Sequence, residues 1–203
     1  MSAGPMADLR FEVQGDTLPG DNAWALCLAV TRVLPWLESE AGAGIHPLKG
    51  APTDRGTLLI SGRSRLVLRL PAHRVREAEC LSGSILDVGG APLRVGPALV
   101  RKLVPFATLY SRFVNTGSGE QQEFEHDVVG LLAELGIRCK FMCGQRRRAR
   151  GDDGEIEGYS VMLHEVLSDE SVALQERGLG RGRMLGCGML VPHKSIRAVR
   201  REE

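Results

Sequence analysis

The succession of strand and helix patterns is the feature that most constrains the fold of this chain. In its first half, alternating apolar and polar positions predict strands, and apolar residues at helical spacing predict helices. Asp21 or Asn22 can cap the first helix. The expected elements are a strand over 8–15, a helix over 18–40, strands over 57–62 and 64–71, a helix over 72–83, and a strand or hairpin over 84–97 that turns at Gly89–Gly90.

This order, β-α-β-β-α-β, is that of a ferredoxin-like unit, and the second half repeats it more loosely. The sequence therefore predicts an α+β protein of two tandem ferredoxin-like (RRM-like) βαββαβ domains, 1–98 and 99–203. The expected elements of the second half are an extended stretch over 100–117, a helix over 120–136, strands over 137–144 and 154–167 joined by the arginine-rich connection 145–154, a helix over 168–178 and a strand over 184–192.

Composition and cysteine usage predict a soluble, cytoplasmic protein. The N-terminus lacks the basic-then-apolar pattern of a signal peptide, and Arg32 and Pro35 interrupt the longest apolar run, so no membrane partner is expected. The five cysteines are odd in number and scattered, which suits reduced thiols. Cys139 and Cys143 lack a second pair or a nearby His, so we expect no metal site.

Charge is segregated along a chain whose net charge is only +1. Residues 1–100 carry ten basic and ten acidic side chains, whereas 138–150 hold six basic residues and no acidic one. Residues 177–201 hold seven basic residues, again with no acidic one. Such segregation predicts a positive face for a polyanion. The alternative is that these arginines are only solvated loop residues.

The stretch GLGRGRMLGCGMLVPHK, 178–194, contains five glycines within eleven residues. It lacks the Gly-Lys-Ser/Thr of a P-loop and the spacing of a dinucleotide fingerprint. What remains is a turned segment whose exposed N–H groups, with Arg181 and Arg183, can lie against a phosphate backbone. A turn between a helix and an edge strand is the plainer alternative. Because a turn needs fewer glycines, we favour close approach to a ligand.

That stretch resembles the C-terminal glycine-rich loop of the CRISPR-associated repeat-RNA endoribonucleases, which belong to the RAMP superfamily. Further segments resemble the MYXAN subtype, and the resemblance spans about 8–194. It implies two ferredoxin-like folds and cleavage of CRISPR precursor transcripts once per repeat, without metal or cofactor. It also implies retention of the guide RNA product alongside other CRISPR-associated subunits. The segments are LPGDNAWALCLAVTRVLPWL, GIHPLKG, RSRLVLRLP, LDVGGAPLRVG and GYSVMLHEV.

Metal-free RNA cleavage needs a base for the 2′-OH, an acid for the leaving 5′-oxygen and positive charge on the phosphorane. Histidine suits proton transfer because its pKa lies near neutrality. His46 follows the first helix, where related enzymes commonly carry the catalytic histidine, and Lys49 could neutralise the phosphorane. Pro47 restricts His46 to an extended conformation. The alternative is a loop histidine without a role, in which case His193 is the second candidate.

The remaining expectation concerns binding of the repeat hairpin. Only 4% of the residues are aromatic, so affinity should come from phosphates and RNA shape rather than from base stacking. A non-catalytic RNA-binding RAMP-type subunit of a CRISPR ribonucleoprotein complex is the competing interpretation. The candidate RNA-binding residues are Arg146, Arg147, Arg148, Arg150, Gly180, Arg181, Gly182, Arg183, His193 and Lys194.

Overall fold

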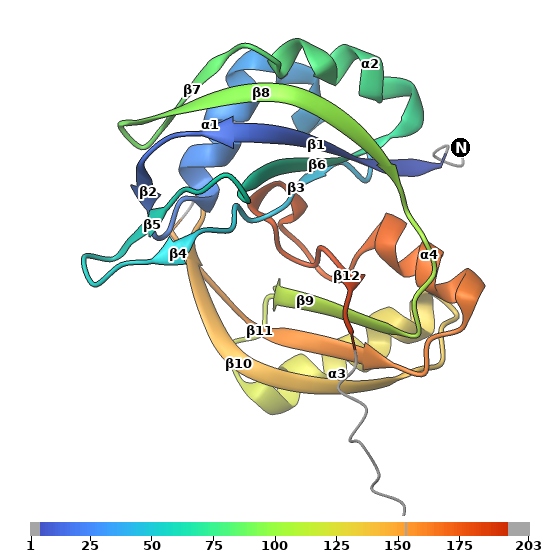
Figure 1. Ribbon diagram of the computed structural model, residues 1–203. Coiled ribbons are helices and arrows are strands. Elements are labelled where there is room, and N and C mark those ends of the chain that lie inside the picture. The colour runs from blue at the N-terminus through green and yellow to red at the C-terminus, as the bar shows by residue number, and fades with distance from the viewer. Residues whose placement is uncertain (1–4, 153, 195–203) are drawn as a thin grey trace, which may run out of the picture.

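The computed structural model of the protein describes residues 5–152 and 154–194. Its first half forms a five-stranded antiparallel sheet in the order β3-β6-β1-β8-β7. In Figure 1, α1 and α2 lie on the outer face of this sheet. The elements are β1 (Met6–Gln14), α1 (Ala23–Val33), β3 (Gly44–Ile45), β6 (Arg65–Pro71), α2 (Val75–Ala78), β7 (Ile85–Val88) and β8 (Ala91–Lys102).

The second half repeats this arrangement in a four-stranded sheet, ordered β10-β11-β9-β12. Both sheets thus place the first and third strands of the unit at the centre. The second strand lies beside the third, and the last strand of each half, β8 or β12, lies beside the first. The predicted class, α+β with two tandem ferredoxin-like folds, is confirmed. The elements are β9 (Thr108–Val114), α3 (Gln121–Glu134), β10 (Lys140–Arg150), β11 (Glu155–His164), α4 (Ser168–Arg177) and β12 (Val191–Pro192).

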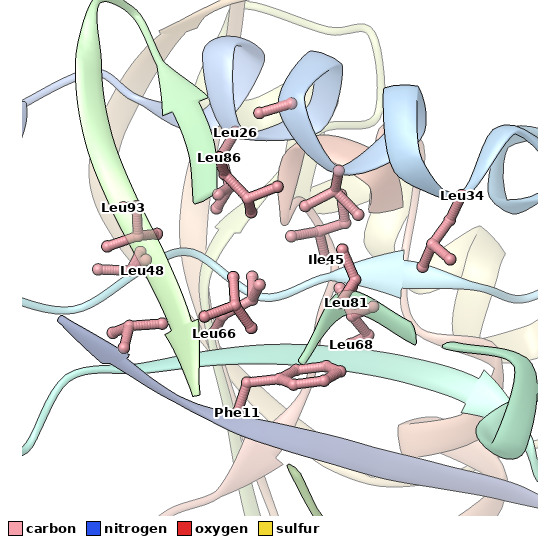
Figure 2. Packing of buried hydrophobic residues seen from close by; sticks show 14 of the residues in the cluster. Phe11, Leu26, Leu34, Ile45, Leu48, Leu66, Leu68, Leu81, Leu86 and Leu93 are labelled. Carbon is pink, nitrogen blue, oxygen red and sulfur yellow. The ribbon is translucent and has the colours of Figure 1, made fainter. Parts of the chain in front are cut away.

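Two hydrophobic cores follow from the sequence patterns. In the first, Leu9, Phe11 and Val13 alternate along β1 and are buried beneath α1. Figure 2 shows Leu26 and Leu34 of α1 packed over sheet residues that include Phe11, Leu66 and Leu68. In the second core, the apolar stripe of α3 packs on β9 and β11. The division predicted between residues 98 and 99 falls inside β8 and stays a prediction.

The segment predicted as the second strand of the first βαββαβ unit is wrong. The strand expected over 57–62 is β5 (Thr57–Leu59), and it pairs with β2 (Thr17–Pro19) and β4 (Ala51–Pro52) in a separate small sheet, not with β6. The second strand of the ferredoxin-like unit is instead β3, inside the segment expected to be a loop. Two residues are too short to show a period, so the pattern cannot reveal this strand.

Two boundaries in the second half also differ from expectation. The arginine-rich segment is not a connection, because Arg146, Arg147, Arg148 and Arg150 belong to strand β10. Charged residues on both faces of a strand hide its alternation. The last strand covers only Val191–Pro192, since Gly182, Gly186 and Gly188 have positive φ angles of 81°, 79° and 66°, which extended strands do not allow.

Candidate active site between the two sheets

His46 lies where the first sheet meets the second half of the chain. It directly follows β3, and its backbone N–H donates to the carbonyl of Val67 in β6 (2.9 Å). Its side chain is 12% exposed, and Nε2 lies 3.5 Å from Oδ1 of Asp8 on β1. Nε2 is buried and makes no hydrogen bond with the described residues. The strand pairing therefore presents the predicted catalytic ring to a carboxylate that the sequence did not single out.

Asp8 is held by Arg69, its cross-strand partner on β6. Arg69 Nε donates to Asp8 Oδ1 (2.7 Å), and NH2 donates to Oδ2 (3.1 Å). The third guanidinium nitrogen, NH1, donates to the carbonyls of Gln175 (2.8 Å) and Leu190 (2.9 Å). Arg69 is fully buried, so a charge that would be costly alone is compensated by an ion pair and four hydrogen bonds.

The electrostatics of this cluster favour a neutral imidazole beside an ionised carboxylate. Burial lowers the pKa of His46; Asp8 opposes this, and the positive charges of Arg69 and Arg183 reinforce it. Burial alone would raise the pKa of Asp8, but its interactions with His46 and Arg69 outweigh that effect and lower it. A neutral histidine can accept a proton, as a general base must.

The other predicted catalytic residues lie apart from this cluster. Lys49 is exposed, and no hydrogen bond or ion pair links it to His46 in the described part of the chain. His193 follows β12, where its ring lies 5.6 Å from that of Tyr110, and its buried Nδ1 has no partner among the described residues. Lys194 beside it is exposed.

The glycines of 178–194 mainly allow the chain to approach itself. A Cβ at Gly186 would lie 2.6 Å from the ring of Pro47, and one at Gly188 would collide with the carbonyl of Leu179. A Cβ at Gly180 would likewise collide with the carbonyl of Asn115. At these three positions an internal contact is therefore sufficient to explain the glycine, and approach to a ligand stays a prediction. Gly180 and Gly182 are nevertheless exposed, and RNA contact there stays a prediction.

The two arginines of this segment face different surroundings. Arg183 turns inward, and its NH2 donates to the carbonyl of Gly42 (2.6 Å), while Nε and NH1 are buried without partners among the described residues. Burial lowers the pKa of Arg183 to about 10, and nearby Arg69 adds to this. Arg181 is exposed beside the Asn115 loop. RNA contact by both stays a prediction, and the placement supports it for Arg181.

Alternation along β10 divides the arginine strand. Arg146 NH2 donates to Glu157 of β11 (2.6 Å), and Arg148 forms ion pairs with Glu157 (2.6 Å) and Glu155 (3.8 Å). Arg147 has no carboxylate partner among the described residues; its NH2 donates to Gln145 (2.7 Å). Arg150 is exposed. Positive charge available to an anion therefore concentrates on Arg147 and Arg150. Farther along the chain, the predicted basic residues Arg197, Arg200 and Arg201 lie outside the described residues.

A cleft of about 290 Å³ joins the segment after His46 to the arginine strand. It contains Arg112 of β9, an exposed arginine without an ion-pair partner in the described chain, which sequence reasoning missed. The alternation of β9 could have revealed it, since its neighbours Ser111 and Phe113 are buried. A larger, shallow depression of about 850 Å³ lies over Lys140 and His164 instead. The cleft is lined by Gly20–Ala23, Pro47, Leu48, Leu58, Arg112, Phe113, Arg147–Ala149 and Leu185.

Two further properties can be read from the described residues. Within 5–152 and 154–194, no group of three or more His, Cys, Asp or Glu side chains could hold a metal ion. Across the same residues, none of the helices has the length and apolar character needed to cross a membrane.

Comparison with known proteins gives concordant matches. The family model Cas6 (Cas6 Crispr) matches residues 7–195. The "CRISPR-associated endonuclease Cas6" of Myxococcus xanthus (strain DK1622) is 31% identical over 186 residues, covering 91% of this chain and 80% of the relative. A solved "CRISPR associated protein Cas6" superposes with a TM-score of 0.65 at 13% identity, covering 93% of this chain and all of the other. Thermus thermophilus Cse3, solved with an RNA representing a pre-cleavage complex, gives 0.54 at 17% identity, over 92% and 98% of the two chains.

Proposed function

The chain belongs to the Cas6 family of CRISPR-associated endonucleases, and we propose that it cleaves CRISPR precursor transcripts within each repeat to release guide RNAs. The proposed reaction needs no metal. The 2′-OH preceding the cut attacks the phosphate, which leaves a 2′,3′-cyclic phosphate and a 5′-OH. Similarity to the Myxococcus xanthus endonuclease supports cleavage. The chemistry of the cluster of Asp8, His46 and Arg69 supports attack by the 2′-OH.

The observation that carries the proposal is the buried His46 imidazole, whose Nε2 lies 3.5 Å from the Asp8 carboxylate, next to a cleft that contains arginines. A general base whose pKa lies near neutrality accelerates a reaction about 10²–10⁴-fold when it takes the nucleophile's proton in the transition state. Positive side chains nearby stabilise the charge that develops on the phosphorane. Lys49, exposed three residues after His46, is the proposed source of such charge.

We assign the RNA-binding face to the arginine strand and the glycine-rich segment. The relative Cse3 was solved with RNA, which supports RNA as the ligand of this fold in our chain. Arg112 and Arg147 line the cleft, and Arg150, Arg181 and Lys194 are exposed. The partner is then the repeat hairpin and, after cleavage, the guide RNA, with other complex subunits as further candidates.

One observation favours a second function. Only 12% of the His46 side chain is exposed, which suits a structural histidine in a subunit that binds repeat RNA without cutting it. The two functions differ in one measurable property, the covalent fate of the RNA.

The test is a single-turnover assay with the organism's own repeat RNA, 5′-labelled, in EDTA. We expect two discrete fragments, with a 5′ fragment that resists phosphatase until acid opens its cyclic phosphate. A repeat with one 2′-deoxy nucleotide before the cut should bind equally and stay intact. Binding without cleavage would assign the RNA-binding function instead. Cleavage of the deoxy repeat, or cleavage only with Mg²⁺, would overturn the mechanism.

The binding face is tested by a matched pair in one strand. Arg147→Gln removes a guanidinium without a carboxylate partner, whereas Arg146→Gln removes one that is already paired with Glu157. We expect Arg147→Gln to weaken repeat binding more and to reduce the slope of log Kd against log salt by about 0.7–0.9, the value for one phosphate contact. Equal effects of the two variants would contradict this assignment.

A further inference from the structure

The contacts of Arg69 tie the predicted catalytic histidine to both halves of the chain. Its guanidinium donates four hydrogen bonds: two to Asp8, one to the carbonyl of Gln175 at the end of α4, and one to the carbonyl of Leu190. A guanidinium has five N–H groups in a rigid plane, so these acceptors fix its orientation. Arg69 in turn fixes both carboxylate oxygens of Asp8.

The fixed carboxylate distinguishes the two nitrogens of His46. Asp8 Oδ1 lies 3.5 Å from Nε2, and Nε2 is buried. The 12% of the side chain that is exposed therefore lies on other atoms of His46. An anion beside one ring nitrogen favours the tautomer with its proton there and leaves the other nitrogen with a lone pair. This geometry therefore favours a proton on Nε2 and leaves Nδ1 as the nitrogen that can act as a base.

We infer that Asp8, locked by Arg69, is a positioning residue that holds His46 in the Nε2–H form and stabilises its imidazolium during RNA cleavage. This inference rests on the proposed function. Nδ1 takes the proton of the 2′-OH, the 2′-oxygen bonds to phosphorus, and the bond from phosphorus to the 5′-oxygen breaks. The leaving oxygen takes a proton from water, and the imidazolium returns its proton to solvent.

The same contacts explain how the glycine-rich segment could influence the reaction. Leu190 lies in this segment, and its carbonyl accepts a hydrogen bond from the same Arg69 NH1 that donates to the carbonyl of Gln175. Three charged groups from three elements surround His46: Asp8 of β1, Arg69 of β6 and Arg183 of the segment itself. A displacement of the segment would therefore change both the position of Asp8 and the charge around the ring.

The competing explanation is that this cluster only joins the two sheets. The two explanations differ in whether the pH–rate profile of cleavage moves with the titration of His46, and that titration can be followed by NMR of ¹⁵N-histidine-labelled protein without RNA. In the wild type we expect the Nε2–H tautomer. In Asp8→Asn the carboxylate charge is lost while Arg69 and Arg183 remain, so the pKa of His46 should fall. The acid limb of the single-turnover pH profile should move with it, and the plateau rate should fall at least about 10-fold.

Asp8→Asn leaves the charge of Arg69 buried and unpaired, so it could fail to fold. The double variant Asp8→Asn/Arg69→Met removes both charges and should still lose the tautomer preference and the rate. Glu40→Gln is the control, since Glu40 lies 4.0 Å from the exposed His73 and should alter neither readout for His46.

Each outcome has one meaning. An unchanged tautomer and titration of His46 in folded Asp8→Asn or in the double variant would overturn the inference. A changed titration with a wild-type rate would overturn the positioning role in cleavage. Failure of the proposed function is seen separately, because wild-type protein would then not cut repeat RNA although the NMR effect persists.

Discussion

The chain combines the same three side-chain types, a histidine, a carboxylate and an arginine, in two places. In the buried trio, Asp8 lies 3.5 Å from His46 and 2.7 Å from Arg69. In the second trio, which lies nearer the surface, Glu40 lies 4.0 Å from His73 and 2.6 Å from Arg74, and the Glu40 side chain is 15% exposed. The distances are similar, but the His46 and Arg69 side chains are 12% and 0% exposed, against 64% and 32% for His73 and Arg74. Burial, rather than composition, therefore distinguishes the two trios.

Their surroundings differ in a second respect. Arg74 stacks over Trp36 at 4.7 Å and also bonds Glu77, so all its contacts lie in the first half of the chain. Arg69 instead reaches the carbonyls of Gln175 and Leu190 in the second half. Water screens the exposed charges, whereas the buried charges interact at low effective dielectric. The comparison teaches that a His–carboxylate–Arg set can tune a proton carrier only where solvent is excluded.

The largest expected difference concerns cleavage. His46→Ala should bind repeat RNA nearly normally but lower the single-turnover rate by about 10²–10⁴-fold, because the proton carrier is lost. His73→Ala should cleave at the wild-type rate. His46→Gln, which better fills the buried site, separates loss of chemistry from loss of folding, with circular dichroism as the check. Full activity of both His46 variants would assign proton transfer to His193 instead. The two trios would then not differ in their contribution to cleavage.

The next difference concerns stability. Arg69→Met leaves the Asp8 carboxylate buried and unpaired, so urea denaturation should show a loss of about 3–5 kcal/mol in the free energy of unfolding. Arg74→Met removes two ion pairs and the stacking on Trp36 from a partly exposed side chain, and it should lower the urea midpoint much less than Arg69→Met does. Equal losses in the two variants would show that burial does not distinguish the trios.

The sequence allowed much of the fold to be predicted. Alternation and helical spacing predicted the βαββαβ order in both halves, although the second strand of the first half was placed at β5 instead of β3. In the predicted helix over 120–136, the apolar residues Phe124, Val128 and Leu132 are buried. Gly89 and Gly90 form the predicted turn, with φ angles of 64° and 88°. Such local signals depend on neighbours within a few residues. β3 is too short to show a periodic pattern, and the arginines of β10 conceal the alternation of that strand.

The candidate site was predictable only in part. His46 was identified from its place after the first helix, but Asp8 looked like one of the polar positions of an alternating strand, equivalent to Arg10 and Glu12. Its burial depends on Arg69 and on the second half of the chain. Arg183 looked like a free phosphate contact for the same reason, since its buried position depends on Gly42, 141 residues earlier. Contacts of this kind have no period and cannot be read from a single strand pattern.

The smallest expected difference is in the pH dependence of stability. The pKa of His46 is lowered in the folded protein, whereas an unfolded histidine has a pKa of about 6.5. Below that pH the unfolded state binds the proton and the folded state does not, so the free energy of unfolding must fall as pH falls. The slope can reach about 1.4 kcal/mol per pH unit for one proton.

The pKa of Asp8 is also lowered, so its own contribution is lost only as the pH falls below about 4, the usual pKa of an unfolded aspartate. Urea denaturation of wild type and His46→Gln at pH 7, 6 and 5 should therefore give converging stabilities, and His73→Gln should follow the wild type in parallel. Parallel curves for His46→Gln would mean that His46 takes up a proton in the folded state as readily as in the unfolded state, and the buried trio would then titrate like an ordinary surface histidine.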